Sequence, residues 1–285
     1  MNIYSSKDEK AKPILEKISK YAQQIDAMNI PYWIFAQNSN PIGLVAIGKE
    51  PLQLLAAPGT PLALIHLLDL ESRDNAERFA SEARKLAAEK DVEYALITLP
   101  SKEDEALSHF KSLRFRDLDD SYRMVCQLDN HFKTSGELEF VRVERVEMRH
   151  FVKVAKEFLK DSPDIILAKA LEHFLDLPED FLNFYYNMEK FYFAKKNKQP
   201  VGILNLNLTK GLISNVGVSS EERGKGYGRQ IMLFGLEQLR SNGCKQAYLR
   251  VHVDNKAAIH LYEALGFTKA DRYRTLIWRK DTKPN

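Results

Sequence analysis

The sequence predicts an α/β (α+β) protein in which one structural plan occurs twice. The chain has 285 residues, which exceeds the usual size of a single domain. Residues 32–48 and 191–207 are also alike: each reads as a strand, a polar turn, and a Pro-apolar-Gly start to the next strand. Each half then runs strand, amphipathic helix, strand and helix, and ends on an aromatic residue, Phe115 or Phe267. This favours a duplication over two unrelated α/β domains.

Composition and charge fit a globular protein with an anionic ligand. Hydrophobic residues make up 44% of the chain and charged residues 28%, which is ordinary for a packed core. The net charge of +3 is too small to indicate nucleic-acid binding. Residues 1–138 carry a net charge of −4 and residues 139–285 one of +7. The second half therefore suits an anionic ligand, and no nucleic acid is expected as a partner.

No targeting or membrane segment is expected, and the sequence indicates a cytoplasmic protein. The first ten residues lack the basic-then-apolar order of a secretory signal. The most apolar stretch, residues 51–70, is interrupted by two prolines and a glycine and is too broken to span a membrane. Cys126 and Cys244 have no metal-ligand spacing, so we expect reduced thiols and no metal.

A polar segment, residues 129–136, separates the two copies and is the expected linker. The predicted domains are therefore residues 1–132 and 139–285. Behind the linker, residues 139–144 alternate like a strand. Two helices are predicted over 147–160 and 164–176, on either side of an Asp-Ser-Pro stop.

A glycine-rich loop follows the apolar strand 212–218 and begins a helix. Backbone N–H groups of such a loop, together with the positive end of the helix, point at one place that suits a pyrophosphate. Glycine is needed there because a Cβ would block close approach. The loop is neither a Walker motif nor the dinucleotide fingerprint, since its glycines have the wrong spacing. The residues that carry this pattern are Arg223, Gly224, Lys225, Gly226, Tyr227, Gly228 and Arg229.

This segment resembles the GCN5-related N-acetyltransferase (GNAT) family. The family signature Arg/Gln-x-x-Gly-x-Gly/Ala is matched by Arg223, Gly226 and Gly228. The second signature is similar to the strand 248–253 and the segment 254–267 that follows it. The resemblance extends over about residues 139–280. It implies tandem GNAT-like domains, each a mixed, mostly antiparallel sheet flanked by helices, with acetyl-CoA as co-substrate and no metal.

The resemblance also implies roles for single residues. The backbone of Val216, Gly217 and Val218 would pair with the pantetheine arm, and the loop 223–229 would hold the pyrophosphate. Asn255 would reach the pantetheine or phosphate side, and Ala258 would leave room beside the cofactor. Tyr262 would point at the thioester sulfur. Its phenol, with an ordinary pKa of about 10, suits a proton donor to the leaving thiolate.

The base that deprotonates the acceptor amine stays open. Several ribosomal-protein acetyltransferases of the family carry a Glu on the strand before the Asn motif, and Arg250 stands at the matching position. This departure weakens the case for a ribosomal-protein N-terminus as substrate. His252 lies on the same strand face and is one candidate base. Ser214 and Asn215 are the alternative, because they could position a water. Arg250 is either a solvated strand charge or a ligand for a substrate carboxylate.

The first copy has lost each of these features. Its corresponding loop, residues 70–79, has no glycine and carries Glu71, Asp74 and Glu77, which would repel a pyrophosphate. Glu103 matches the Asn position and Phe110 the Tyr position. The first domain is therefore expected to be a degenerate GNAT-like domain.

The expected function is transfer of an acetyl group from acetyl-CoA to a primary amine by direct attack in a ternary complex. The amine belongs to a small molecule or a protein, and its identity, the acyl length and the oligomeric state stay open. The alternatives are a non-catalytic acyl-CoA-binding regulatory module, a transferase for a longer acyl-CoA, and a scaffold. The aromatic run 181–186 and the residues 191–193 line an acceptor pocket or, more simply, fill the core.

Overall fold

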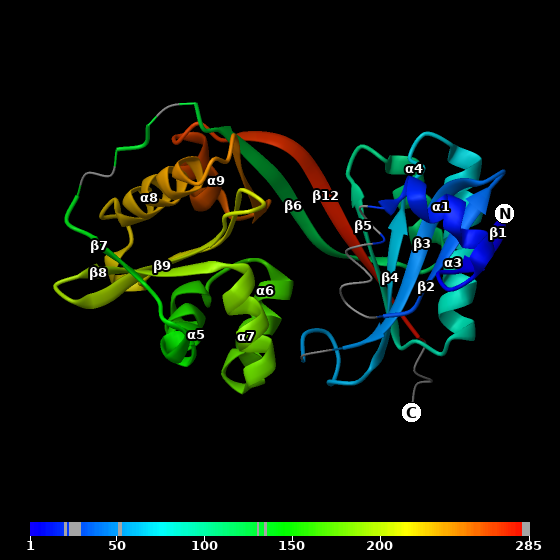
Figure 1. Cartoon of the computed structure of the whole chain (residues 1–285), viewed down its shortest axis with the longest axis horizontal. Helices are drawn as coiled ribbons and strands as arrows, with labels where there is room; N and C mark the ends of the chain where they lie inside the picture. The colour runs from blue at the N-terminus through cyan, green and yellow to red at the C-terminus, as the bar shows by residue number, and fades with distance from the viewer. Residues whose placement is uncertain (20–21, 23–29, 51–52, 130, 134–135, 281–285) are drawn as a thin grey trace. The chain divides into compact units, whose positions relative to one another are not determined.

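The computed structural model describes residues 1–19, 22, 30–50, 53–129, 131–133 and 136–280. The chain forms two compact units (Figure 1). The first unit contains residues 1–120 and 272–285, and the second contains residues 121–271. These units differ from the domains predicted above, because residues 272–280 belong to the first unit and residues 121–129 to the second. The boundaries 1–132 and 139–285 stay a prediction for the two copies of the repeat.

The first unit is a mixed sheet with helices, in the strand order β1-β2-β3-β4-β5-β12. Among the strand pairs that its described residues form, β4–β5 is parallel and the others are antiparallel. The elements are β1 (Asn2–Ser5), a 3₁₀ turn (Glu9–Ala11), α1 (Lys12–Lys17), β2 (Tyr32–Gln37), β3 (Asn40–Lys49), β4 (Pro61–Leu67), α3 (Arg73–Glu89), β5 (Tyr94–Pro100) and α4 (Asp104–Ser112). Two long strands, β6 (Arg116–Gln127) and β12 (Thr268–Arg279), continue from one unit into the other.

The second unit repeats this plan, in the strand order β6-β11-β10-β9-β8-β7. Its one parallel pair is β10–β11. The elements are β7 (Glu139–Arg142), α5 (Met148–Leu159), α6 (Ile165–His173), α7 (Glu179–Met188), β8 (Lys190–Lys196), β9 (Gln199–Asn207), β10 (Leu212–Val218), α8 (Tyr227–Ser241), β11 (Gln246–His252) and α9 (Lys256–Glu263). Short 3₁₀ turns lie at Arg145–Glu147, Phe174–Asp176 and Ser220–Glu222. The strand and the two helices predicted from residue 139 onward are thus present.

The repeat extends to single residues in the hairpins. The β2–β3 turn holds Asn38 and Ser39 at positive φ, and the β8–β9 turn holds Asn197 and Lys198 in the same way. Positive φ at both turn residues is the geometry that matches the twist of a two-residue hairpin. Each hairpin also has a register shift just before its turn.

Two glycines at matching positions let a helix approach the sheet in each unit. A Cβ at Gly43 of β3 would lie 2.4 Å from the ring of Phe79 on α3. A Cβ at Gly202 of β9 would lie 2.4 Å from Cδ1 of Ile231 on α8. The glycine that opens the second strand of each copy, noted in the sequence, therefore serves helix packing.

The final strand of each copy is exchanged between the units. The second half of β6, which ends the first copy, pairs antiparallel with β11 from Ser121↔His252 to Gln127↔Gln246. The last residues of β12, which ends the second copy, pair antiparallel with β5 from Tyr273↔Pro100 to Arg279↔Tyr94. Each sheet is therefore completed by a strand from the other copy.

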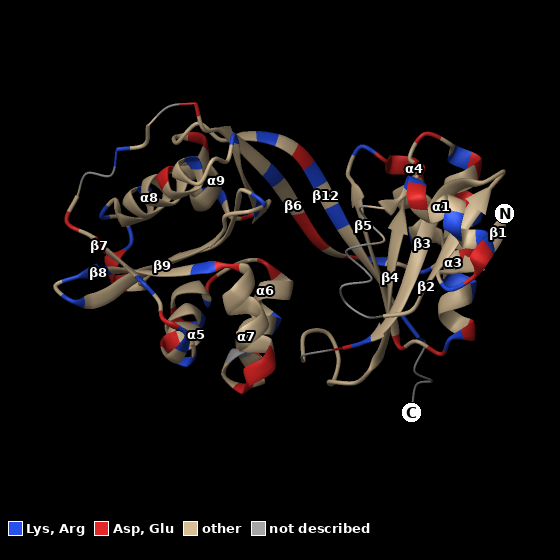
Figure 2. Cartoon of the chain, in the orientation of Figure 1, with Lys and Arg blue, Asp and Glu red and all other residues tan. Residues whose placement is uncertain are grey.

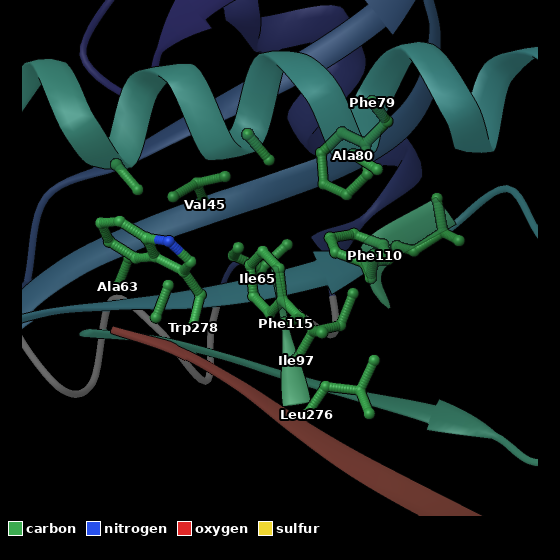
Figure 3. Close-up of a cluster of buried hydrophobic side chains, with 14 of the residues drawn as sticks. Val45, Ala63, Ile65, Phe79, Ala80, Ile97, Phe110, Phe115, Leu276 and Trp278 are labelled. Atoms are coloured by element: carbon green, nitrogen blue, oxygen red, sulfur yellow. The ribbon is translucent and has the colours of Figure 1, made fainter. Parts of the chain in front are cut away.

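The core of the first unit depends on this exchange (Figure 3). Leu276 and Trp278 of β12 lie in one cluster with Phe79 of α3 and Phe110 of α4, and all four are at most 2% exposed. The second unit has its own cores on the two faces of its sheet. In them Phe191, Tyr192 and Phe193 of β8 are buried, as a core role for these aromatics requires.

Charged side chains of both signs are mixed along the helices, as on α3 and α4 in Figure 2. Among the residues that the structure describes, no helix is long and apolar enough to cross a membrane. The described residues also contain no group of three or more His, Cys, Asp or Glu side chains that could hold a metal ion.

Candidate active site

A cleft of about 440 Å³ lies in the second unit where β10 and β11 separate. The two strands are paired at Leu212 and Tyr248, and the N–H of Tyr248 donates to the carbonyl of Gly211 at 2.8 Å. No second register pair joins β10 and β11 within the described residues. On its other edge β10 stays paired with β9 as far as Val218. The backbone of β10 therefore has one open edge facing the cleft, which suits an extended ligand added like a strand.

A bulge in β10 accompanies this separation. Ile213 lies opposite Leu206 of β9, but Asn215 lies opposite the next residue, Asn205, so Ser214 is extra. Bulges increase local twist and redirect side chains. Ser214, Asn215, Val216, Gly217 and Val218 all line the cleft. The predicted cofactor strand thus forms one of its walls.

The glycine loop lies between the end of β10 and the start of α8, with a geometry that admits a phosphate. Gly224 and Gly226 have φ of +80° and +82°, which side chains with a Cβ rarely adopt. A Cβ at either position would meet no atom within 4 Å, so the space beside the backbone is open. Gly226 precedes α8, whose first N–H groups have no partner within the helix. Residues present at this helix start therefore fit a pyrophosphate.

The other predicted loop residues have structural contacts. A Cβ at Gly228 would lie 3.2 Å from Leu261 of α9, so this glycine brings α8 close to α9. The side chain of Tyr227 is buried, and its hydroxyl bonds to Lys196 and Glu137. Only the backbone of Tyr227 is left for a cofactor.

The three loop cations are each engaged with protein groups. Arg223 lines the cleft and forms an ion pair with Asp161 at 2.7 Å, and it also donates to the carbonyls of Phe158 and Val218. Lys225 lies 3.1 Å from Glu222, and Arg229 reaches the carbonyl of Ala264 at 3.5 Å. All three cationic residues are solvent-exposed, and their contacts are weak enough for a bound anion to compete. Direct phosphate contacts by these side chains stay a prediction.

Tyr262 lines the cleft from α9. Burial raises the pKa of its phenol to about 12. The hydroxyl therefore stays protonated throughout the neutral range, as a proton donor must. The ring contacts Phe267 with a centroid distance of 5.9 Å, and this pair fixes the helix end beside Gly266.

Asn255 and Ala257 also line the cleft from the start of α9. The Asn255 Oδ1 accepts a hydrogen bond from the N–H of Ala258 and so caps the helix. Its side-chain NH₂ group is the part that could bind a ligand. Ala258, which the resemblance places beside the cofactor, packs against the core, and Ala257 lines the cleft. The place of Ala258 beside the cofactor stays a prediction.

His252 and Arg250 lie at the end of β11, where both line the cleft. The Nδ1 of His252 accepts a hydrogen bond from the N–H of Asp254 at 3.2 Å. We assign the ring proton to Nε2 on this basis, which leaves no free lone pair for a base. A basic role for His252, still a prediction, would require this bond to break. Arg250 donates to Ser121 at 2.5 Å while bordering the cleft.

Sequence reasoning missed the opposite wall and one buried acid. That wall comes from α5, the α5–α6 turn and α6. Its residues are Phe158, Leu159, Asp161, Asp164 and Leu167. Such residues carry no motif, since only the fold brings them to the cleft. Glu189, between α7 and β8, is buried and bonds to Ser214. In the sequence, the one signal for a buried carboxyl group at this position is a single acidic residue next to aromatic residues of the segment 181–193.

The corresponding loop of the first unit is already occupied by a protein carboxylate. The Oδ1 of Asp69 accepts from the N–H groups of Glu71 and Ser72, both at 3.2 Å, and its Oδ2 accepts from Asn75 at 2.9 Å. Ser72 caps α3. Three N–H groups around this helix start, those of Glu71, Ser72 and Asn75, are therefore bound within the chain.

The helix ends that follow these loops match in both units. The N–H of Phe115 donates to the carbonyl of Phe110, and the N–H of Phe267 donates to that of Tyr262. Arg114 has a positive φ of 69°, where the second copy has Gly266 at 90°. Phe110 is fully buried and has no hydroxyl. The first unit therefore has the same helix end as the second unit, but Phe110 lacks the hydroxyl that Tyr262 has at the matching position.

Known proteins match the part of the chain that contains this cleft. Residues 153–267 match the acetyltransferase (GNAT) family profile. A stretch of 59 residues, 21% of this chain and 20% of the relative, is 52% identical to a mycothiol acetyltransferase from Thermobispora bispora. The chain thus matches about a fifth of the length of such curated relatives.

Solved structures show the same fold over nearly the whole chain. A tandem GNAT protein from the clavulanic acid biosynthesis pathway aligns with a TM-score of 0.67 and 15% identity, covering 99% of this chain and 100% of that one. A GCN5-related N-acetyltransferase from Sphaerobacter thermophilus aligns with a TM-score of 0.61 and 13% identity, covering 89% and 82%. At such identities the likeness concerns the fold alone. The fold of the chain is thus that of tandem GNAT proteins, and its second unit contains the GNAT domain.

Proposed function

We propose, from the premise that residues 153–267 are a GNAT domain, that this chain transfers an acetyl group from acetyl-CoA to a primary amine. The observation that carries the proposal is one continuous cleft that joins the open edge of β10 to Tyr262. The glycine loop stands at the end of that same strand. The strand edge that suits a thioester arm, the loop that suits a pyrophosphate and the proton donor Tyr262 therefore lie close together.

Acetyl-CoA would use the backbone more than side chains. The pantetheine arm would lie along β10 beside Val216, Gly217 and Val218, whose backbone is open on the cleft side. The pyrophosphate would lie at Gly224–Gly226 and the start of α8. When bound, acetyl-CoA supplies the activated acetyl group. The chain orients that group and excludes water.

The transfer itself needs an oxyanion donor and an acid. As the amine attacks the thioester carbonyl, negative charge develops on its oxygen. A backbone N–H at the open edge of β10 is suited to stabilise that charge, an effect worth about 2.7–4 kcal/mol in well-studied enzymes. Tyr262 then protonates the leaving thiolate. Its raised pKa means that the hydroxyl is protonated at neutral pH, and it also makes Tyr262 a weaker acid than an exposed phenol. Direct attack in a ternary complex needs both substrates in the cleft at once.

The acceptor would lie between β10 and the wall formed by α5 and α6. That wall presents Asp161 and Asp164 beside the apolar side chains of Phe158 and Leu167. Carboxylates suit a cationic amine, and the apolar part suits the carbon skeleton around it. The same apolar wall favours a second candidate, a transferase for a longer acyl-CoA. A donor series from acetyl- to octanoyl-CoA distinguishes the two.

Turnover with defined amines tests the proposal. Release of the CoA thiol from acetyl-CoA is followed with glucosamine, spermidine, phenethylamine and alanylalanine amide, which represent four classes of primary amine. We expect one class to give turnover in the wild type and a strongly reduced rate in Tyr262→Phe. Acetyl-CoA binding without turnover of any amine would favour the regulatory module instead.

A further inference from the structure

Glu189 is a buried acid in the second unit to which the proposed reaction assigns no role. It lies between α7 and β8, and its side chain is 8% exposed. Its Oε1 accepts a hydrogen bond from the hydroxyl of Ser214 at 2.5 Å. Its Oε2 is buried and accepts no hydrogen bond within the distance and angle limits of a normal one in the described part of the chain, although the side chain of Asn205 is near enough to influence the carboxyl group. A carboxyl group held in this way costs stability, so a function is its best explanation.

Ser214 connects this acid to the cleft. It is the bulged residue of β10, and it lines the cleft beside Asn215, whereas Glu189 does not line it. The bulge therefore gives one hydroxyl contact with both the cleft and the buried carboxyl. Any effect of Glu189 on a substrate must pass through Ser214.

The surroundings of Glu189 let its carboxyl group exchange a proton. Burial raises the pKa of Glu189, and the hydrogen bond from Ser214, the nearby polar side chain of Asn205 and the charge of Lys210 offset part of this rise. On α7, Tyr185 faces the same carboxyl, and burial and the charge of Glu189 raise its pKa, so Tyr185 stays neutral. Glu189 is the acidic group among these neighbours, and a raised pKa makes it a better proton acceptor than an exposed carboxylate.

We propose that Glu189, acting through the Ser214 hydroxyl, takes the proton that the acceptor ammonium must lose before it attacks. This inference rests on the proposed acetyl transfer. It supplies the base that the strand β10 lacks, since residues 212–218 contain no acid. His252, the other candidate, has its Nδ1 lone pair engaged by the N–H of Asp254. Ser214 would contact the amine or its bound water, and Glu189 is a positioning residue that receives the proton.

The proton balance of the reaction closes with these groups. The ammonium gives one proton to the Ser214 oxygen while Ser214 passes its own proton to Glu189, which becomes neutral. The free amine forms a bond to the thioester carbon, and the carbon–sulfur bond breaks. Tyr262 protonates the thiolate and recovers a proton from the nitrogen as the amide forms. Glu189 returns its proton to water through Ser214 after the products leave.

The pH dependence of kcat/KM separates this relay from a structural role. The probe is acetyl-CoA with the best acceptor of the four amines, measured from pH 6 to 10. In the wild type we expect kcat/KM to be independent of pH below the pKa of the amine, because the enzyme itself removes the proton of the ammonium group. Glu189→Gln keeps the shape of the side chain but cannot accept a proton. It should lower kcat/KM at pH 7 about tenfold for each unit by which the pKa of the amine exceeds 7, with a tenfold recovery per pH unit up to that pKa.

Two further variants complete the experiment. Ser214→Ala leaves Glu189 in place and should give the same sloping profile as Glu189→Gln. Glu50→Gln is the matched control, because Glu50 is a buried carboxyl in the first unit, 3% exposed, that likewise accepts a hydroxyl hydrogen bond at 2.5 Å, from Tyr94. It should keep the plateau of the wild type.

The outcomes distinguish the relay from the reaction. If Glu189→Gln or Ser214→Ala reduced kcat/KM by the same factor at every pH, or not at all, the relay would be wrong and the acetyl transfer would stand. If the wild type acetylated none of the four amines at any pH, the proposed function would fail and the relay with it. A plateau in the wild type and slopes in both variants would support the relay.

Discussion

Arg223 Nη1 and Asp161 Oδ2 lie 2.7 Å apart and join the glycine loop to the α5–α6 turn. The same guanidinium reaches the carbonyls of Val218 and Phe158, so one side chain connects β10, α5 and the loop. The first residue of the family signature thus links the proposed cofactor site to the proposed acceptor wall. This contact gives Arg223 a role in holding the loop that does not require it to touch a phosphate.

Asp161→Asn should therefore weaken acetyl-CoA binding by about two- to fivefold, as loss of a solvent-exposed ion pair allows. Calorimetry of acetyl-CoA binding measures it. Asp164→Asn, on the same turn but in a helix-capping contact with Leu167, is the control and should leave the Kd of acetyl-CoA unchanged. Tighter binding by Asp161→Asn would show instead that Asp161 competes with the phosphates for Arg223.

Gly226→Ala should abolish most acetyl-CoA binding at a modest cost in stability. Its φ of +82° makes an L-residue strained by about 1–2 kcal/mol, and the new Cβ would stand in the open space where a phosphate would lie. Gly243→Ala is a matched control, since Gly243 has a φ of +85° and equally open surroundings beyond the far end of α8. Chemical denaturation should show similar losses for both variants, and calorimetry a loss of binding for Gly226→Ala alone.

Tyr262→Phe should lower kcat and leave the Kd of acetyl-CoA nearly unchanged, because the ring keeps its packing against Phe267 and loses only the hydroxyl. We expect a reduction of about a hundredfold, within the usual range for a positioned acid. Since burial raises the pKa of Tyr262 to about 12, the phenol loses its proton only near that pH. No loss of wild-type activity below pH 10 should come from this residue. An unchanged kcat in Tyr262→Phe would exclude it as the acid.

Leu276→Ala should destabilise the first unit without affecting the cofactor site. Leu276 is fully buried against that unit's core, although the sequence of the second copy contributes it. Removing such a side chain costs about 2–5 kcal/mol. Denaturation followed by tryptophan fluorescence, which comes from Trp33 and Trp278 of the first unit, measures the loss. Acetyl-CoA binding should persist in the variant below its unfolding range, and loss of binding would contradict the independence of the second unit's site.

Glu189→Gln should change how stability depends on pH. The pKa of Glu189 is raised in the folded chain above its ordinary value of 4.5. The wild type therefore loses stability as the pH rises through the interval between the unfolded and folded pKa, because the unfolded chain ionises first. The variant lacks this loss, so its stability relative to the wild type should improve from pH 4 to pH 8. A constant difference would show that Glu189 titrates normally.

The sequence was informative where local chemistry decides the structure. Positive φ at Gly224 and Gly226, the hairpin turns at 38–39 and 197–198, and the helix end at Gly266 all follow from residue type and spacing. The duplication was visible for the same reason. The tandem GNAT fold predicted from these features is the fold of the chain.

Long-range pairing was beyond the sequence. The strands β6 and β12 close their copies in the same way, and both alternate well enough to complete either sheet, so nothing local specifies the exchange. The wall of Phe158, Asp161 and Leu167 depends on how α5 and α6 pack on the sheet. Glu189 meets Ser214 only because a bulge in β10 turns that hydroxyl toward it.

Thermal melting with and without acetyl-CoA, in the wild type and in Gly226→Glu, tests the central claim most directly. At a ligand concentration a hundred times the Kd, binding stabilises the folded chain by about 2.7 kcal/mol. For a unit of this size, that corresponds to a rise in Tm of roughly 5–10 °C. We predict this rise in the wild type and none in Gly226→Glu, whose carboxylate would occupy the phosphate position. No rise in the wild type, or an equal rise in both proteins, would contradict an acetyl-CoA site at the glycine loop.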